Sequence, residues 1–149
     1  MIKKLLLIVV LSTSMFAYKT GDTINEEVIK QLKLEDGKVY IVDFFASWCK
    51  SCNIELPLIS KLGKQLDDKY EILGVNIDRD RYLANTYVAK LNLNFRVYFD
   101  NSNDLVSKFN PIGVPAIYYI KDKKVLKTVF GAVSHIDQKI KSDLNSIGE

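Results

Sequence analysis

The stretch Val39–Pro57, VYIVDFFASWCKSCNIELP, decides the fold. Its first seven residues are β-branched or aromatic apart from Asp43, and such a continuous apolar run predicts a central strand covered on both faces. After Cys49 the apolar residues recur at helical spacing, which predicts a helix that begins near Cys49 and is kinked by Pro57. The two cysteines therefore lie at a predicted junction between a buried strand and a helix.

The spacing of the cysteines indicates how each is used. At the start of the helix, Cys49 faces unpaired N–H groups and the positive end of the helix dipole, and both favour a thiolate. Lys50 adds a positive charge beside it. Cys52 lies about one helical turn further on, within reach of a disulfide. This pattern predicts Cys49 as the attacking thiolate and Cys52 as the resolving thiol.

Two other uses of a Cys-x-x-Cys pair compete with redox chemistry. A zinc site needs two further ligands, whereas the sequence has no other cysteine and a single histidine, His135. An inert structural disulfide would close a very short loop and gain little loop-closure entropy. The pattern favours a redox disulfide, Cys49–Cys52, that needs no metal and no organic cofactor.

The order of these features resembles thioredoxin, with Asp43 six residues before the first cysteine. Glu55 and Pro57 after the second cysteine, in WCKSCNIELP, are more similar to the TlpA/ResA-type thiol–disulfide oxidoreductases of bacterial envelopes. Three later stretches resemble strands of that family in the same order, namely GVNID (74–78), YFD (98–100) and IGVPAIYYI (112–120). The resemblance covers roughly residues 37–132.

The resemblance assigns roles to three further residues. It implies a cis peptide bond between Val114 and Pro115, which would bring this turn beside Cys49 and leave the backbone of Val114 free to pair with an extended substrate. It also implies that Glu55 lies near the cysteines and tunes their acidity. A solvated position on the helix surface is the alternative for Glu55.

Asp43 and Trp48 are the other candidate site residues. A lone carboxylate in an apolar strand is costly, so the pKa of Asp43 should be raised. We interpret Asp43 as the proton acceptor for Cys52, reached through water, with a satisfied polar group of the core as the alternative. We interpret Trp48 as a wall of the substrate groove.

The N-terminal residues have the pattern of a secretory signal peptide. Lys3 and Lys4 precede an apolar segment, residues 5–11, that is too short to cross a bilayer. We expect cleavage after Ala17, with cleavage after Ser14 or an uncleaved membrane anchor as alternatives. The expected organisation is a signal peptide at residues 1–17 and a thioredoxin-like domain at residues 18–149, located in the periplasm or another extracytoplasmic compartment.

Composition and periodicity define the rest of the fold. The chain has 149 residues, 48% hydrophobic and 26% charged, as expected for one globular domain. Strands are predicted near 70–77, 95–99, 116–120 and 125–130, and helices near 25–34, 80–93, 104–109 and 134–147, the last capped by Ser134. This alternation predicts the α/β class with a central mixed β-sheet flanked by helices. The resemblance implies the thioredoxin fold, with an extra strand–helix insertion at residues 77–111 before the cis-proline strand.

These features predict a thiol–disulfide oxidoreductase of the cell envelope that reduces disulfides in substrate proteins. By resemblance, a membrane thiol relay would supply electrons, and apocytochrome c is one candidate substrate. The net charge of +3, part of it from Lys3 and Lys4, offers no basic patch for nucleic acid, and we expect a monomer. A DsbA-like oxidase or isomerase, and a redox-inert binding or chaperone module, remain as alternatives.

Overall fold

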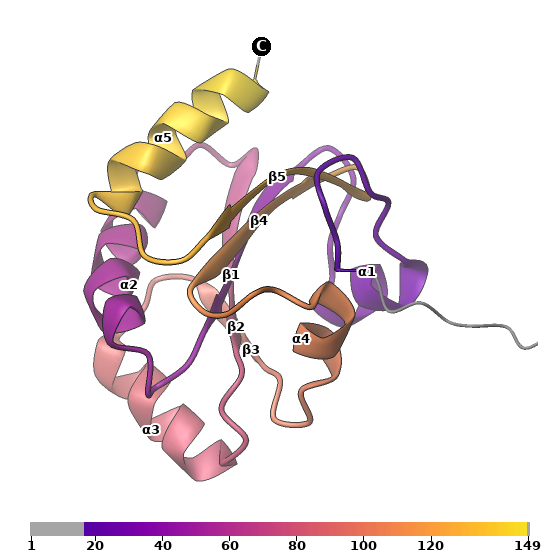
Figure 1. Cartoon of the computed structure of the whole chain (residues 1–149). Coiled ribbons are helices and arrows are strands. Elements are labelled where there is room, and N and C mark those ends of the chain that lie inside the picture. Colours follow the sequence, from indigo (N-terminus) through magenta and orange to yellow (C-terminus); the bar gives the residue numbers. More distant parts are fainter. Residues whose placement is uncertain (1–16, 149) are drawn as a thin grey trace, which may run out of the picture.

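The computed structural model describes residues 17–148, so the predicted signal peptide lies outside the described residues apart from Ala17. Within that range, five helices surround one five-stranded sheet (Figure 1). None of these helices combines the length and the apolar character needed to span a membrane.

The sheet is mixed, with its strands in the order β3-β2-β1-β4-β5. The central strand β1 (Val39–Phe45) is parallel to β2 (Tyr70–Asn76) and antiparallel to β4 (Ala116–Lys121). The two edges are β3 (Arg96–Phe99), parallel to β2, and β5 (Lys124–Phe130), antiparallel to β4. Every residue of β1 is buried, which confirms the covered central strand predicted from its apolar run.

Helices cover both faces of the sheet (Figure 1). The helices α1 (Glu26–Leu32) and α4 (Asp104–Phe109) pack on one face, and α2 (Lys50–Gly63), α3 (Arg81–Leu91) and α5 (Ile136–Ile147) pack on the other. Because side chains alternate along a strand, the even-numbered residues of β1 face α1 and α4, and the odd-numbered residues face the other three helices. The helix that carries the cysteines is on the odd-numbered side.

The segment between β2 and β4 contains α3, β3 and α4. It corresponds to the residues for which the sequence predicted an additional strand and helix. By pairing in parallel with β2, β3 extends the parallel part of the sheet. The carboxyl ends of β1, β2 and β3 consequently lie along one edge, and the cysteines follow the first of these ends.

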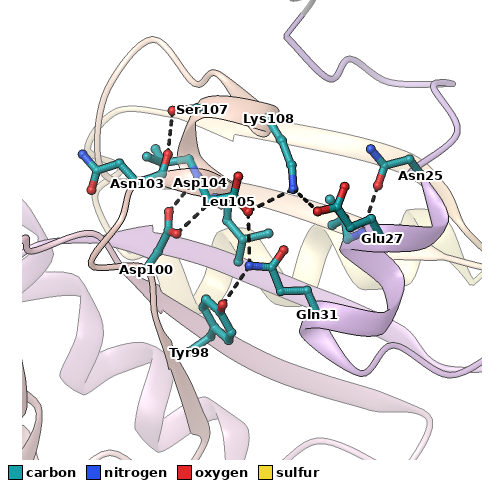
Figure 2. Close-up of polar contacts among 12 residues, drawn as sticks. Asn25, Glu27, Gln31, Tyr98, Asp100, Asn103, Asp104, Leu105, Ser107 and Lys108 are labelled. Carbon is teal, nitrogen blue, oxygen red and sulfur yellow. Dashed lines mark hydrogen bonds and ion pairs between the residues drawn. The ribbon is translucent and has the colours of Figure 1, made fainter.

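Polar contacts join α1, α4 and the end of β3 (Figure 2). Lys108 Nζ lies 2.9 Å from both Glu27 Oε1 and Asp104 Oδ2. Gln31 Nε2 donates to Tyr98 Oη at 2.7 Å. These contacts hold two short helices, neither of which would be stable alone, against the same face of the sheet.

The N-terminus of α4 is capped from outside the helix. The buried carboxylate of Asp100 accepts hydrogen bonds from the N–H groups of Leu105 and Val106, at 3.1 and 2.8 Å (Figure 2). Asn103, at the N-cap position, makes no such side-chain bond. Asp100, the residue directly after β3, thereby fixes the start of the next helix.

The prediction that Ser134 caps the last helix is wrong. The N-cap residue of α5 is His135, which has a left-handed φ of 54° and makes no side-chain capping bond. The N–H of the preceding Val133 donates to Glu55 on α2. This tertiary contact holds residues 133 and 134 as a loop, and the helix starts only where Ile136 enters the core.

Candidate active site

The two cysteines lie where the carboxyl end of β1 leads into the N-terminus of α2. Cys49 is the N-cap residue of α2, and its Sγ accepts the N–H of Cys52 at 3.2 Å. The pair forms a disulfide, with its Cα atoms 5.3 Å apart. Ser51 Oγ lies 3.5 Å from Cys49 Sγ, a contact that the sequence alone did not single out. The junction is the one that strand and helix periodicity predicted.

Both cysteines are buried, Cys49 slightly less than Cys52. Cys49 is 6% exposed and Cys52 1% exposed. Cys49 also occupies the helix position at which the dipole and free N–H groups favour a thiolate, and the exposed Lys50 follows it. Both observations support Cys49 as the attacking sulfur and Cys52 as the sulfur that resolves the mixed disulfide.

The turn before β4 lies beside the cysteine pair. The Val114–Pro115 peptide bond is cis, and the side chain of Val114 packs against the cluster that contains Cys49 and Cys52. The carbonyl of Pro115 accepts the N–H of Gly131 at 2.9 Å. The backbone of Val114 makes no hydrogen bond within residues 17–148, so its N–H and C=O are available to an extended chain.

Asp43 is buried in β1 on the side that faces α2. Its Oδ1 has no hydrogen-bond partner among the described residues. Burial raises the pKa of Asp43 well above its ordinary value, and the charge of Glu55 raises it further. A buried carboxyl with a raised pKa is a stronger base than an ordinary aspartate, and with one free oxygen it can exchange a proton with a group on the facing helix.

Glu55 is buried on α2, three residues after Cys52, so the alternative of a solvated surface residue is wrong. Its Oε1 accepts the N–H of Val133 at 2.7 Å. Burial raises the pKa of Glu55, and the hydrogen bond from Val133 opposes that rise. The negative charge of Glu55 raises the pKa of Asp43, so the ionisation of one carboxyl group affects that of the other.

Asp78 is a site residue that sequence reasoning missed. It is buried, and its carboxylate accepts hydrogen bonds from the N–H and Oγ of Ser47, at 2.9 and 2.8 Å, and from Asn76 Nδ2 at 2.7 Å. These bonds tie the end of β2 to the loop that carries Trp48. An aspartate just after a buried strand that runs parallel to β1 was the signal that could have revealed it.

Comparisons with known proteins agree with this geometry. A family model described as thioredoxin-like matches residues 37–125, which is more than half of the chain. The chain therefore belongs to the thioredoxin-like family, and its paired cysteines have Cys-x-x-Cys spacing at the start of α2.

Two curated relatives are similar in sequence to most of this chain. The thioredoxin of Buchnera aphidicola subsp. Baizongia pistaciae is 26% identical over 116 residues, which cover 78% of this chain and 86% of that protein. The thiol-disulfide oxidoreductase ResA of Bacillus thuringiensis subsp. konkukian is 28% identical over 106 residues, 68% of this chain and 61% of that protein. This chain thus spans about three fifths of the length of ResA.

A solved structure shares the fold over nearly its whole length. The Chlorobium tepidum protein assigned as a thiol:disulfide interchange protein DsbE superposes with a TM-score of 0.74. The superposition covers 87% of this chain and 98% of that chain, at 20% sequence identity. At this identity the likeness establishes the shared fold.

Proposed function

We propose that this protein is a thiol–disulfide oxidoreductase that reduces disulfides in substrate proteins through Cys49 and Cys52. The observation that carries the proposal is the position of Cys49: it caps α2 and is the less buried residue of a disulfide pair beside the cis-proline turn. The relatives named thioredoxin and ResA support the same class of reaction.

The reaction transfers two electrons in two exchange steps. The Cys49 thiolate attacks one sulfur of the substrate disulfide, which forms a mixed disulfide and releases the other substrate sulfur as a thiolate. Cys52, after losing its proton, attacks Cys49 Sγ and releases the second substrate sulfur. The substrate gains two electrons and, from solvent, its protons, and the Cys49–Cys52 disulfide remains.

The surrounding groups have distinct roles in these steps. Asp43 accepts the proton of Cys52 through water, which its raised pKa and unpaired Oδ1 support. Glu55 acts through its charge, which raises the pKa of Asp43, and we assign it an influence on the acidity of the cysteines rather than contact with the substrate. The free backbone of Val114 pairs with the substrate, and Trp48 borders the groove in which the substrate lies.

The working compartment is the cell envelope. Residues 1–17 act as a signal peptide cleaved after Ala17, and residues 18–149 form the mature domain, for which the charged start and short apolar stretch are the support. Proteins with exposed disulfides, apocytochrome c among them, are the substrates. A membrane protein of the thiol-relay type restores the dithiol by supplying the two electrons consumed in each cycle.

Insulin reduction by dithiothreitol tests the proposed activity. The protein should accelerate precipitation of the insulin B chain, and neither Cys49→Ser nor Cys52→Ser should do so at a comparable rate. A wild-type protein that leaves the rate unchanged but suppresses aggregation of an unfolded client would instead be a redox-inert binding module.

A further inference from the structure

The residues on either side of the cysteine pair are both hydrogen-bonded to the segment that follows β2. Residues 48–52 contain the two cysteines, and we refer to them as the redox turn. Ser47 directly precedes this turn and bonds to Asp78, in the loop after β2. Asn53 directly follows the turn and bonds to Tyr87 of α3. The redox turn is therefore held at both ends by one neighbouring segment of the chain.

The contact before the redox turn is made to a buried and fixed carboxylate. Asp78 is 5% exposed and accepts both the N–H and the Oγ–H of Ser47. The side chain of Asn76, in β2, donates to the carboxylate of Asp78 at 2.7 Å and accepts the N–H of Asp78 at 3.1 Å. Because Asn76 holds both the side chain and the backbone of Asp78, the position of Ser47 is tied to the end of β2.

The contact after the redox turn is made by a tyrosine hydroxyl. Tyr87 Oη donates to Asn53 Oδ1 at 2.7 Å. The ring of Tyr87 packs against the cluster that contains the two cysteines, with its centroid 6.2 Å from that of Phe45. Burial and nearby negative charge, chiefly that of Asp78, raise the pKa of Tyr87 to about 12. The hydroxyl therefore stays protonated and able to donate.

We propose that Asp78 and Tyr87 are positioning residues, which hold the two ends of the redox turn and thereby favour the Cys49–Cys52 disulfide over the dithiol. This inference rests on the proposed function, because it concerns the pair that reduces substrate disulfides. Neither residue exchanges electrons or protons with the substrate. Both act through the residues next to the redox turn.

The physical reason is the conformational freedom of the reduced turn. In a dithiol the two cysteines can move apart, and bringing them together again costs conformational entropy. The contacts at Ser47 and Asn53 keep the Cα atoms of the cysteines near their separation of 5.3 Å, which is within the usual range for a disulfide. Part of the entropy is thus already lost in the dithiol, so the disulfide forms more readily. A more stable disulfide makes the dithiol a stronger reductant.

Equilibration with glutathione measures this effect. The disulfide of the protein accepts two electrons and two protons from two glutathione thiols, which become glutathione disulfide. Ser47→Ala removes the Oγ bond to Asp78, and Tyr87→Phe removes the bond to Asn53. Each should raise the equilibrium constant for reduction of the protein about threefold, a factor at the lower end of what one hydrogen bond contributes. The double variant should raise it about tenfold, which corresponds to about 30 mV in reduction potential.

Two further variants show whether the Tyr87–Asn53 bond itself is responsible. Asn53→Ala should raise the constant as much as Tyr87→Phe does, and the combination of the two should add nothing, because both remove the same bond. Tyr82→Phe is the matched control, since Tyr82 lies on the same helix but is 77% exposed. It should leave the constant unchanged.

The equilibrium constant separates positioning from a general structural role. A bond that stabilises the oxidised and reduced proteins equally lowers the free energy of unfolding of both when it is removed, but leaves this constant unchanged. Asp78 and Tyr87 lack the proposed role if Ser47→Ala or Tyr87→Phe fails to raise the constant, or if Tyr82→Phe raises it equally. Those results leave the proposed function intact. A wild-type disulfide that does not equilibrate with glutathione at all overturns both inferences.

Discussion

Cys49 and Cys52 are chemically alike in the unfolded chain, and their surroundings in the fold make them different. Cys49 caps α2 and keeps a small exposed fraction, whereas Cys52 is almost fully covered in the first turn of the helix. An incoming disulfide therefore meets Cys49 first, and Cys52 reacts only with a sulfur already held at Cys49. The order of attack follows from burial and helix position rather than from the identity of the residues.

A Cys52→Ser variant should accumulate mixed disulfides with substrate, and Cys49→Ser should not. Without the resolving thiol, the complex formed at Cys49 has no internal route to release. Non-reducing electrophoresis after incubation with a disulfide substrate measures the trapped fraction. Faster modification of Cys52 than of Cys49 by iodoacetamide at pH 6, in the reduced wild type, would reverse the two roles.

Asp43 should make folding stability depend on pH. Its pKa is raised in the folded state, so between the ordinary aspartate value of about 3.9 and the raised value the folded protein binds more protons than the unfolded chain. Stability should therefore be highest below this interval and fall as the pH rises through it. Asp43→Asn should remove most of the decline, measured by urea unfolding of the oxidised protein between pH 4 and 8.

The control for this effect is Asp68→Asn, which changes an exposed carboxyl group and should keep the decline. Asp43→Asn should also lengthen the lifetime of the mixed disulfide by about 100-fold, because Cys52 loses its proton acceptor. An unchanged lifetime, together with a flattened pH profile, would leave Asp43 with a structural role only.

Glu55→Gln should increase the reactivity of Cys49. Where Glu55 is ionised, its negative charge disfavours a nearby thiolate, and glutamine keeps the shape and can still accept the N–H of Val133. We expect alkylation of reduced protein by iodoacetamide at pH 6 to become several-fold faster. Slower or unchanged alkylation would mean that the Glu55 charge does not reach the cysteine pair.

At the scale of secondary-structure elements, the site depends on how β1 and β2 approach each other. Phe45 ends β1 just before the active-site loop, and its ring lies against Gly74 of β2. A Cβ atom on Gly74 would come within 2.8 Å of a ring carbon of Phe45 and 3.0 Å of one of Phe95. The glycine is therefore required for the close approach of these rings to the strand.

Gly74→Ala should destabilise the protein by about 1–3 kcal/mol, because the added methyl group overpacks a buried aromatic contact. Urea unfolding at constant pH measures the loss. Gly113→Ala is the control: its Cβ would meet nothing within 4 Å, so the free energy of unfolding should hardly change. Equal effects of the two substitutions would contradict the packing argument.

At the scale of the whole molecule, the direction of electron flow depends on the balance of charge around α2. The helix terminus and Lys50 stabilise the thiolate, while Asp43 and Glu55, when ionised, destabilise it. No histidine lies between the cysteines to add a charged hydrogen bond. A dithiol is strongly oxidising only when its thiolate is exceptionally stabilised, and here the opposing charges limit that stabilisation.

We therefore expect a reduction potential of about −270 to −220 mV, nearer to thioredoxin than to DsbA. Equilibration with glutathione buffers of known ratio, followed by separation of the reduced and oxidised forms, measures it. A potential above about −160 mV would assign the protein to the oxidases instead of the reductases.

The fold and the reactive pair could be predicted from sequence because their signals are local. The apolar run of β1, the helical spacing after Cys49 and the Cys-x-x-Cys interval each lie within a few residues. Backbone geometry converts such short patterns directly into a strand, a helix start and two sulfurs one turn apart. Asp43 was likewise predictable, since an isolated carboxylate within an apolar strand must be buried.

Tertiary structure alone decided the contacts between residues far apart in the chain. Three such contacts shape the site. The N–H of Val133 donates to Glu55 just before α5 begins, and Ser47 donates to Asp78. Trp48 and Leu83 line the same cleft, although they belong to different segments of the chain. Periodicity indicates which face of an element is apolar, but not which distant residue will cover it. The helix that carries the cysteines was therefore visible in the sequence, whereas the partners that shape its surroundings became visible only in the folded molecule.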